Sequence, residues 1–333
     1  MSQCSGNAID HEVELHYYTG IRNFGDELSP YLISKITGRK VSLASSEEGL
    51  YAIGSILTHK ALWSSCVVWG TGTLCHDSLS GETLRVFPLN RSIPKLIKRL
   101  MEALQKPSLI LCPENFCLLH KLNFLCKRLF RVLLKSFLIS PETTKADIRA
   151  VRGPLTREAI LKEGGKCPEI YGDPAIIMPR LYTPKIGAKH KAGLILHHTQ
   201  ETPTTHVLAK TCGFHQISID RVRDEQLENF IDEVCSCQKI FSSSLHGIIL
   251  AQAYGIPAQW IQITNTPIHR DANHKFADYF LGAGLPVQKP ISIELTKESL
   301  SQLMQISPER LHISSDLIER LLEAFPFDIF PKK

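Results

Sequence analysis

The residues that are best suited to chemistry lie in one stretch, FSSSLHGIILAQAYGIPAQW, at positions 241–260. Three serines, His246 and Gly247 stand between a short run of β-formers and an apolar run with helical spacing. The first turn of a helix offers unpaired N–H groups and the positive end of the helix dipole, which together bind anions. Ser243 and Ser244 add hydroxyl donors, and Gly247 leaves room for a bulky anion. A histidine such as His246 can serve as an acid or a base, because an unperturbed imidazole exchanges protons near neutral pH.

Two interpretations of this turn follow from the residues alone. In the first, Ser243, Ser244 and Gly247 bind an anion such as a phosphate or carboxylate, and His246 is an acid that is charged only when the anion is bound. In the second, a serine caps an ordinary helix and the histidine packs beside it.

Polar residues also follow several other predicted strands, at the edge where parallel sheets bind ligands. The residues that we expect to line a cleft are Asn23, Gly25, Gly70, Gly72, Asp173 and His198. Asp26 is a candidate base, or it caps its own loop. Arg152 either clamps a carboxylate or phosphate of the donor or pairs with an acid inside the fold.

Alternating strand and helix patterns position these turns. Residues 13–20 predict a strand, the next segment predicts a helix that ends at Gly38, and 169–178 predict a strand and turn. A second alternation begins after 191. Such βα units indicate an α/β fold with two doubly wound, Rossmann-like parallel sheets that face a cleft.

The predicted domain boundaries follow from this alternation. We expect an N-terminal domain over 12–180, a donor-binding domain over 190–300, and a C-terminal helix within 301–330 that returns to the first domain. A helical insertion at about 77–146 interrupts the first domain. Its residues 91–138 hold ten Lys or Arg and two acids, a net formal charge of +8. We expect peripheral contact with the inner face of an anionic membrane, or a solvated basic face on a packed helical pair.

Composition excludes several other classes. The 333 residues are 43% hydrophobic and 21% charged, which is typical of globular proteins. The net charge of +5 belongs to one segment, so we expect no nucleic-acid partner. The ten cysteines form no C-x-x-C pair, and we assign neither a metal nor a cofactor. Neither a signal peptide nor a membrane-spanning run is visible, so we expect a cytoplasmic protein.

The turns, in this order, resemble those of the polysaccharide pyruvyl transferase family. The matching pieces are IRNFGDELSPYLISKITG, VVWGTGTL, DIRAVRGPLTREAI, YGDPAIIMPRLY, GLILHH, KIFSSSLHGIILAQAYGIPAQWI and KFADYFLGAG. The resemblance implies a fold similar to B-type glycosyltransferases and an enzyme that transfers the enolpyruvyl group of phosphoenolpyruvate to two hydroxyls of a sugar. The acceptor would be a cell-surface polysaccharide or its lipid-linked precursor. In that chemistry His246 and Asp26 would move protons, and Arg152 and the 243–247 turn would hold the donor.

One position departs from the family. Related enzymes carry arginine two residues before the histidine, where this chain has Ser244. Arg152, His269 or Arg270 would then supply the missing charge. Two alternatives stay open: a nucleotide-sugar glycosyltransferase of the same architecture, and a non-catalytic carbohydrate or membrane scaffold. No acid lies between Phe241 and Asp271 to bind a ribose, which favours the compact donor.

Overall fold

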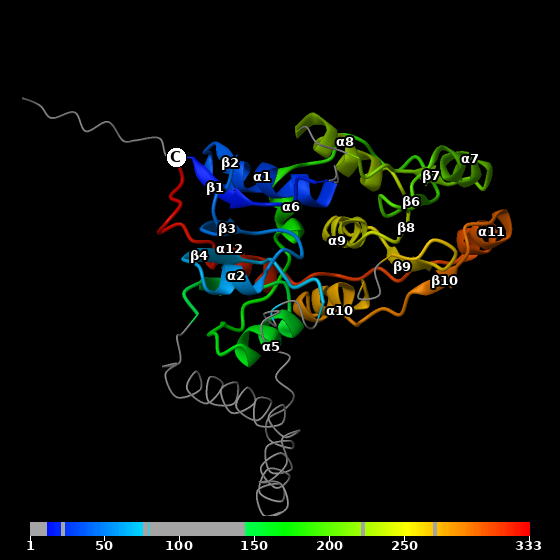
Figure 1. The fold of residues 1–333 in the computed structure, drawn as a ribbon. Coiled ribbons are helices and arrows are strands. Elements are labelled where there is room, and N and C mark those ends of the chain that lie inside the picture. Colours follow the sequence, from blue (N-terminus) through cyan, green and yellow to red (C-terminus); the bar gives the residue numbers. More distant parts are fainter. Residues whose placement is uncertain (1–11, 21–23, 76–78, 80–143, 221–223, 269–271) are drawn as a thin grey trace, which may run out of the picture. The chain divides into compact units, whose positions relative to one another are not determined.

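Two parallel sheets organise the computed structural model, which describes residues 12–20, 24–75, 79, 144–220, 224–268 and 272–333 (Figure 1). Asn23, His269, Arg270 and the basic segment 91–138 lie outside the described residues. The predicted insertion lies largely outside them as well, so its membrane contact stays a prediction. No described helix is long and apolar enough to cross a bilayer.

The first sheet has the strand order β2-β1-β3-β4-β5, and all its described pairings are parallel. Its strands are β1 (Val13–His16), β2 (Val41–Leu43), β3 (Gly49–Tyr51), β4 (Cys66–Trp69) and β5 (Asp147–Ala150). All four residues of β4, CVVW, are buried. A continuous apolar strand of this kind suits a sheet covered on both faces.

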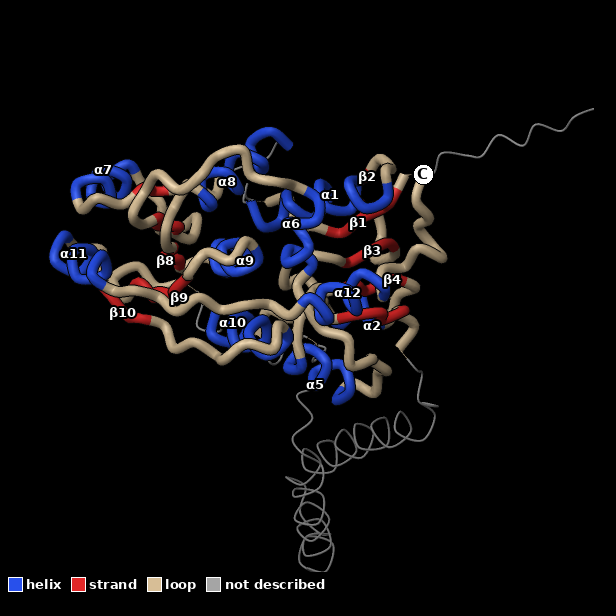
Figure 2. Tube along the Cα trace, turned by 180° about the vertical axis from the view of Figure 1, so that it is seen from behind, coloured by secondary structure: helices blue, strands red, loops and turns tan. Residues whose placement is uncertain are grey.

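Helices connect and cover these strands (Figure 2). They are α1 (Phe24–Thr37), α2 (His59–Leu62), α5 (Pro154–Lys162), the 3-10 helix η3 (Pro174–Ile177) and α6 (Met178–Leu181). In α1, Leu28, Leu32 and Ile36 recur at helical spacing and are buried. The helix ends at Gly38, whose φ of 70° is the left-handed conformation that glycine adopts readily after a helix.

The second sheet repeats the plan with the order β10-β9-β8-β6-β7, again with parallel pairings. Its strands are β6 (Gly193–Ile195), β7 (His215–Gln216), β8 (Ile240–Ser242), β9 (Ala258–Ile263) and β10 (Ile291–Ile293). Its helices are α7 (Pro203–Thr211), α8 (Asp224–Cys235), α9 (Leu245–Ala253), α10 (Ala272–Gly282) and α11 (Lys297–Gln305). The last helix, α12 (Ser315–Glu323), lies against the first sheet, since Trp69 Nε1 donates to the Leu321 carbonyl at 2.8 Å.

These two sheets with alternating helices confirm the predicted α/β, Rossmann-like fold class. Segments 12–79 and 144–333 belong to one compact unit, in which α10 packs beside α5 (Figures 1 and 2). The exact domain boundaries stay predictions. One local expectation was wrong: after an isolated bridge at Tyr171, residues 174–177 form the 3-10 helix η3. Pro174 has no N–H to give to a strand ladder.

Candidate active site

The predicted turns after β1, β6 and β8 lie at the topological switch points of the two sheets. From β1 the chain adds β2 on one side and β3 on the other, and from β6 it adds β7 on one side and β8 on the other. Ligands of doubly wound sheets bind beyond the carboxyl ends of the strands at such points. The loops that follow β1, β3, β6 and β8 therefore hold the candidate site.

Helix α1 begins directly against His246. A Cβ atom at Gly25 would collide with the imidazole ring at Nδ1, so only glycine allows this approach. Two contacts hold the start of the helix there: Phe24 N donates to the Ile219 carbonyl at 2.7 Å, and the Phe24 ring stacks on Phe230 at 4.0 Å. The structure thus brings together Gly25 and His246, which lie more than 200 residues apart in the sequence.

The serine turn is built largely from internal hydrogen bonds. Ser242 Oγ donates to the Ser244 carbonyl at 2.8 Å and accepts from Ser244 N at 3.0 Å. Ser243 Oγ donates to Gln200 Oε1 at 2.6 Å and accepts from His197 N at 2.9 Å. These bonds join the loops that follow β6 and β8.

Ser244 is the N-cap of α9, and its side chain makes no capping hydrogen bond. It therefore leaves the first-turn N–H groups of α9 available to a ligand. Gly247 lies one turn inside the helix, where a Cβ would meet the Ser242 hydroxyl and Ile195. The absent side chain at Gly247 thus allows close packing of α9 on the sheet.

His246 faces Asp173 across 3.8 Å, measured from Nε2 to Oδ2. The His246 side chain is 15% exposed and Asp173 is fully buried, and neither of these two atoms has a hydrogen-bond partner. Burial, and to a smaller extent the charges of Lys275 and Arg152, lower the pKa of His246 to about 3. Burial raises the pKa of Asp173 to about 6. At neutral pH, a neutral imidazole therefore faces an ionised carboxylate.

Arg152 pairs with an acid inside the fold. Its guanidinium is fully buried: Nε donates to Asp278 Oδ2 at 3.1 Å, Nη1 to Ser55 Oγ at 2.6 Å and Nη2 to the Thr73 carbonyl at 2.8 Å. Gly72 packs on its face, where a Cβ would collide with it. These three hydrogen bonds use the guanidinium of Arg152 inside the fold.

Asp278, on α10, also caps α5 of the first half. Its Oδ1 accepts from Leu155 N at 2.9 Å and Thr156 N at 3.0 Å, and its Oδ2 accepts from Thr156 Oγ1 at 2.7 Å. A carboxylate suits the positive end of α5. His274 Nε2 lies 2.9 Å from Thr73 Oγ1. These contacts fix α10 to the loops that follow β4 and β5.

Lys275 is a site residue that the sequence analysis missed. It lies between His274 and Asp278 on α10, and the charges of Lys275, His246, Arg152 and Asp26 act on one another. No described residue forms a hydrogen bond or ion pair with its ammonium, which lies 5.9 Å from the centre of the Phe276 ring. Burial and Arg152 lower the pKa of Lys275 to about 8, against the opposing effect of Asp26. A partly desolvated cation without a partner among the described residues is costly, and an anionic ligand would offset that cost.

The remaining predicted residues lie around this centre. Asp26 is in the first turn of α1, with Oδ1 3.6 Å from where a Cβ of Gly54 would stand. Gly70 packs on Pro174 next to Asp173. Asp173 also makes the local bond expected of a capping aspartate, since its Oδ1 accepts from Ala175 N at 3.0 Å.

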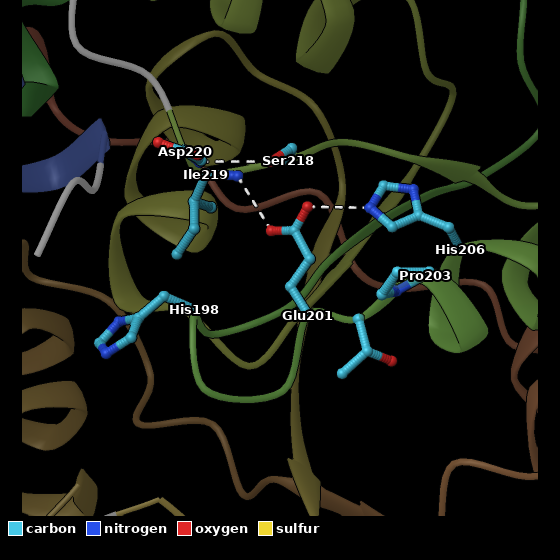
Figure 3. A pocket seen from close by; sticks show the side chains of 8 residues that line it. His198, Glu201, Pro203, His206, Ser218, Ile219 and Asp220 are labelled. Atoms are coloured by element: carbon cyan, nitrogen blue, oxygen red, sulfur yellow. Dashed lines mark hydrogen bonds and ion pairs between the residues drawn. The ribbon is translucent and has the colours of Figure 1, made fainter.

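His198 lies apart from the His246 centre, in a pocket of 540 Å³ beyond β6 and β7 (Figure 3). Glu201 lies in the middle of this pocket, 2.9 Å from His206 Nε2, and accepts from Ile219 N at 3.4 Å. The pocket volume lies within the range of small-molecule sites. Among the described residues, no three His, Cys, Asp or Glu side chains gather as a metal site. The assignment of no metal stays a prediction.

Comparisons with known proteins cover part of this site. Residues 137–265 match the family model of polysaccharide pyruvyl transferase. A similar curated protein is the uncharacterized protein L143 of Acanthamoeba polyphaga mimivirus, 29% identical over 116 residues, or 34% of this chain and 40% of the viral one. The match thus spans less than half the length of that viral relative. No solved structure matches this chain.

The matched segment includes Arg152, Asp173 and the whole 241–260 stretch. The resemblance seen in the sequence is therefore confirmed over residues 137–265, which match the polysaccharide pyruvyl transferase model.

Proposed function

We propose that this chain is a ketal pyruvyl transferase that takes the enolpyruvyl group of phosphoenolpyruvate and joins it to two hydroxyls of one saccharide. The observation that carries the proposal is the N-terminus of α9, which no side chain caps, beside His246 and the ammonium of Lys275 from α10, for which the described residues provide no hydrogen-bond or ion-pair partner. These groups suit a small, doubly anionic donor. The family match over 137–265 supports the same reaction class.

The reaction needs two proton movements. As the first sugar hydroxyl adds to C2 of phosphoenolpyruvate, C3 gains a proton and becomes a methyl group, and the hydroxyl loses one. The second hydroxyl then forms a bond to C2 while the bond from C2 to the phosphate oxygen breaks. The phosphate leaves with the proton of that second hydroxyl. One group able to accept and return a proton serves both steps.

His246 fits this role because its protonation depends on what occupies the site. Burial and neighbouring cations hold its pKa at about 3, so the imidazole is neutral at neutral pH. A phosphate and a carboxylate beside it would favour the imidazolium form. His246 would therefore become an acid only when the donor is present. Asp26, in the first turn of α1, is our candidate for activating the acceptor hydroxyl.

The positive charge missing at Ser244 would come from Lys275 and, through its field, from Arg152. We propose a saccharide acceptor for the other side of the site, near the start of α1. The acceptor would be a polysaccharide or its lipid-linked precursor, and the transfer reaction would take place in the cytoplasm beside the membrane. The segment 91–138 would make that membrane contact.

The test is phosphate release from phosphoenolpyruvate that requires both the chain and a saccharide, with mass spectrometry of the sugar product. We expect the product to gain one pyruvate less one water, and the His246→Ala variant to lose turnover while it unfolds at the wild-type temperature. Full activity of His246→Ala would remove His246 from the mechanism. Transfer from a nucleotide sugar instead would identify a glycosyltransferase.

A further inference from the structure

His246 and Asp173 leave two buried polar atoms facing each other. Nε2 of the imidazole and Oδ2 of the carboxylate are 3.8 Å apart, and neither has a hydrogen-bond partner. Buried polar groups without partners are rare because the lost hydration is not replaced. A shift of about 1 Å would bring the pair to hydrogen-bond distance.

The opposite sides of both groups are fixed. Asp173 Oδ1 accepts from Ala175 N at 3.0 Å, so Oδ2 is the oxygen that is turned to the histidine. Nδ1 of His246 lies against Gly25 at the start of α1. The two ring nitrogens therefore have different surroundings: Nε2 is enclosed beside Asp173, and Nδ1 lies at the loop of the first sheet's switch point.

We propose that Asp173 is a positioning residue that holds His246 as the Nε2–H tautomer, so that Nδ1 is the nitrogen that exchanges protons with the ligand. An ionised carboxylate only accepts, so Nε2 must carry the hydrogen when the two groups meet. The other tautomer would set a lone pair of Nε2 against a lone pair of Oδ2. In neutral imidazole, the bond made by one nitrogen fixes the role of the other.

Charged groups around the pair agree with this arrangement at pH 8. Arg152 favours the ionised form of Asp173, Asp278 opposes it, and burial raises the pKa of Asp173 to about 6, so the carboxylate is ionised at pH 8. Lys275 and Arg152 disfavour a second proton on His246. The tautomer is therefore a property of the protein without ligand. The part of the inference that concerns proton exchange with a donor rests on the proposed function.

Nitrogen NMR tests the tautomer directly. The full chain would be labelled with ¹⁵N-histidine, and two-bond ¹H–¹⁵N correlations recorded at pH 8, with His246 assigned by its loss in His246→Gln. We expect a protonated, pyrrole-type shift for Nε2 and a pyridine-type shift for Nδ1. A wild-type His246 protonated at Nδ1 would overturn the inference, whatever the chain catalyses.

The Asp173→Asn variant should reverse this pattern. The amide oxygen of asparagine would still accept from Ala175 N, so its NH₂ group would face Nε2 and could only donate. His246 would then carry its hydrogen on Nδ1. The matched control is Asp232→Asn, a buried aspartate that accepts from Tyr182 Oη and Lys185 N away from the site, and it should leave the tautomer unchanged. An unchanged tautomer in folded Asp173→Asn would also overturn the inference.

Turnover gives a second readout. The same aspartate-to-asparagine change in serine protease triads lowers kcat by about 10⁴-fold, because the histidine takes the wrong tautomer. We expect a fall in kcat of at least about 10²-fold in Asp173→Asn, with KM for phosphoenolpyruvate within about threefold of wild type. A loss seen only in KM would contradict a positioning role. If wild type does not use phosphoenolpyruvate, the proposed function fails, and the NMR result still decides the tautomer.

Discussion

The stability of the fold should respond to pH in opposite directions when Asp173 or His246 is replaced. Asp173 titrates near 3.8 in an unfolded chain and at about 6 in the fold. Between about pH 4 and 6 the folded state holds a proton that the unfolded state has lost. The contribution of Asp173 is therefore full below about pH 4 and is lost as the pH rises through 6, by about 1.4 kcal/mol per pH unit.

His246 has the opposite slope. It titrates near 6.5 in an unfolded chain and at about 3 in the fold. Its contribution is full above about pH 6.5 and is lost as the pH falls, at the same rate of about 1.4 kcal/mol per unit. In wild type the two slopes cancel between about pH 4 and 6. Relative to wild type, Asp173→Asn should therefore gain roughly 3 kcal/mol from pH 4 to 6, and His246→Gln should lose a similar amount.

The measurement is the free energy of unfolding by urea at several pH values in this window, for wild type and both variants. Glu309→Gln, at an exposed position, is the control and should run parallel to wild type. The difference from wild type cancels the titration of all other groups. Curves for Asp173→Asn and His246→Gln that both run parallel to wild type would refute the assigned protonation states.

Two further predictions concern α10. Lys275→Gln should raise the dissociation constant for phosphoenolpyruvate by about 10- to 100-fold in titration calorimetry, since a charge-assisted hydrogen bond is worth about 1.5–3 kcal/mol. The control, Lys289→Gln at an exposed position, should bind phosphoenolpyruvate as wild type does. Asp278→Ala should lower the free energy of unfolding by about 3–5 kcal/mol because it leaves the buried Arg152 charge unpaired. A loss under 1 kcal/mol in urea unfolding would show that water or another group compensates Arg152.

The sequence predicted the repeating parts of the fold well. The βα alternation predicted both sheets, because periods of 2 and 3.6 residues report directly on burial. The turn at 241–247 and the loop with Gly25 and Asp26 were found because polar residues stand out between apolar runs. Periodicity could not predict which residues of distant loops come into contact, such as Gly25 and the His246 ring.

The roles of Lys275, Asp278 and Arg152 could not be predicted from the sequence for one physical reason. Lys275 and Asp278 lie inside a helix whose other residues give an ordinary amphipathic pattern, so nothing in the spacing marks them. Their role depends on burial and on Arg152, some 120 residues earlier in the chain. The sequence left open whether Arg152 clamps a ligand or pairs with an acid, and only the fold supplies that acid. A lysine and an aspartate three residues apart beside buried aromatics was the available signal.

The central claim is that α9 receives a compact anionic donor, and direct binding tests it most simply. Thermal unfolding of the full chain would be followed with phosphoenolpyruvate, inorganic phosphate and a panel of nucleotide sugars. At about 100 times its dissociation constant, a ligand stabilises the fold by roughly 2.7 kcal/mol. We predict stabilisation by phosphoenolpyruvate that is lost in Lys275→Gln, and none by nucleotide sugars. Stabilisation by a nucleotide sugar alone would contradict the account and assign the α9 turn to a diphosphate.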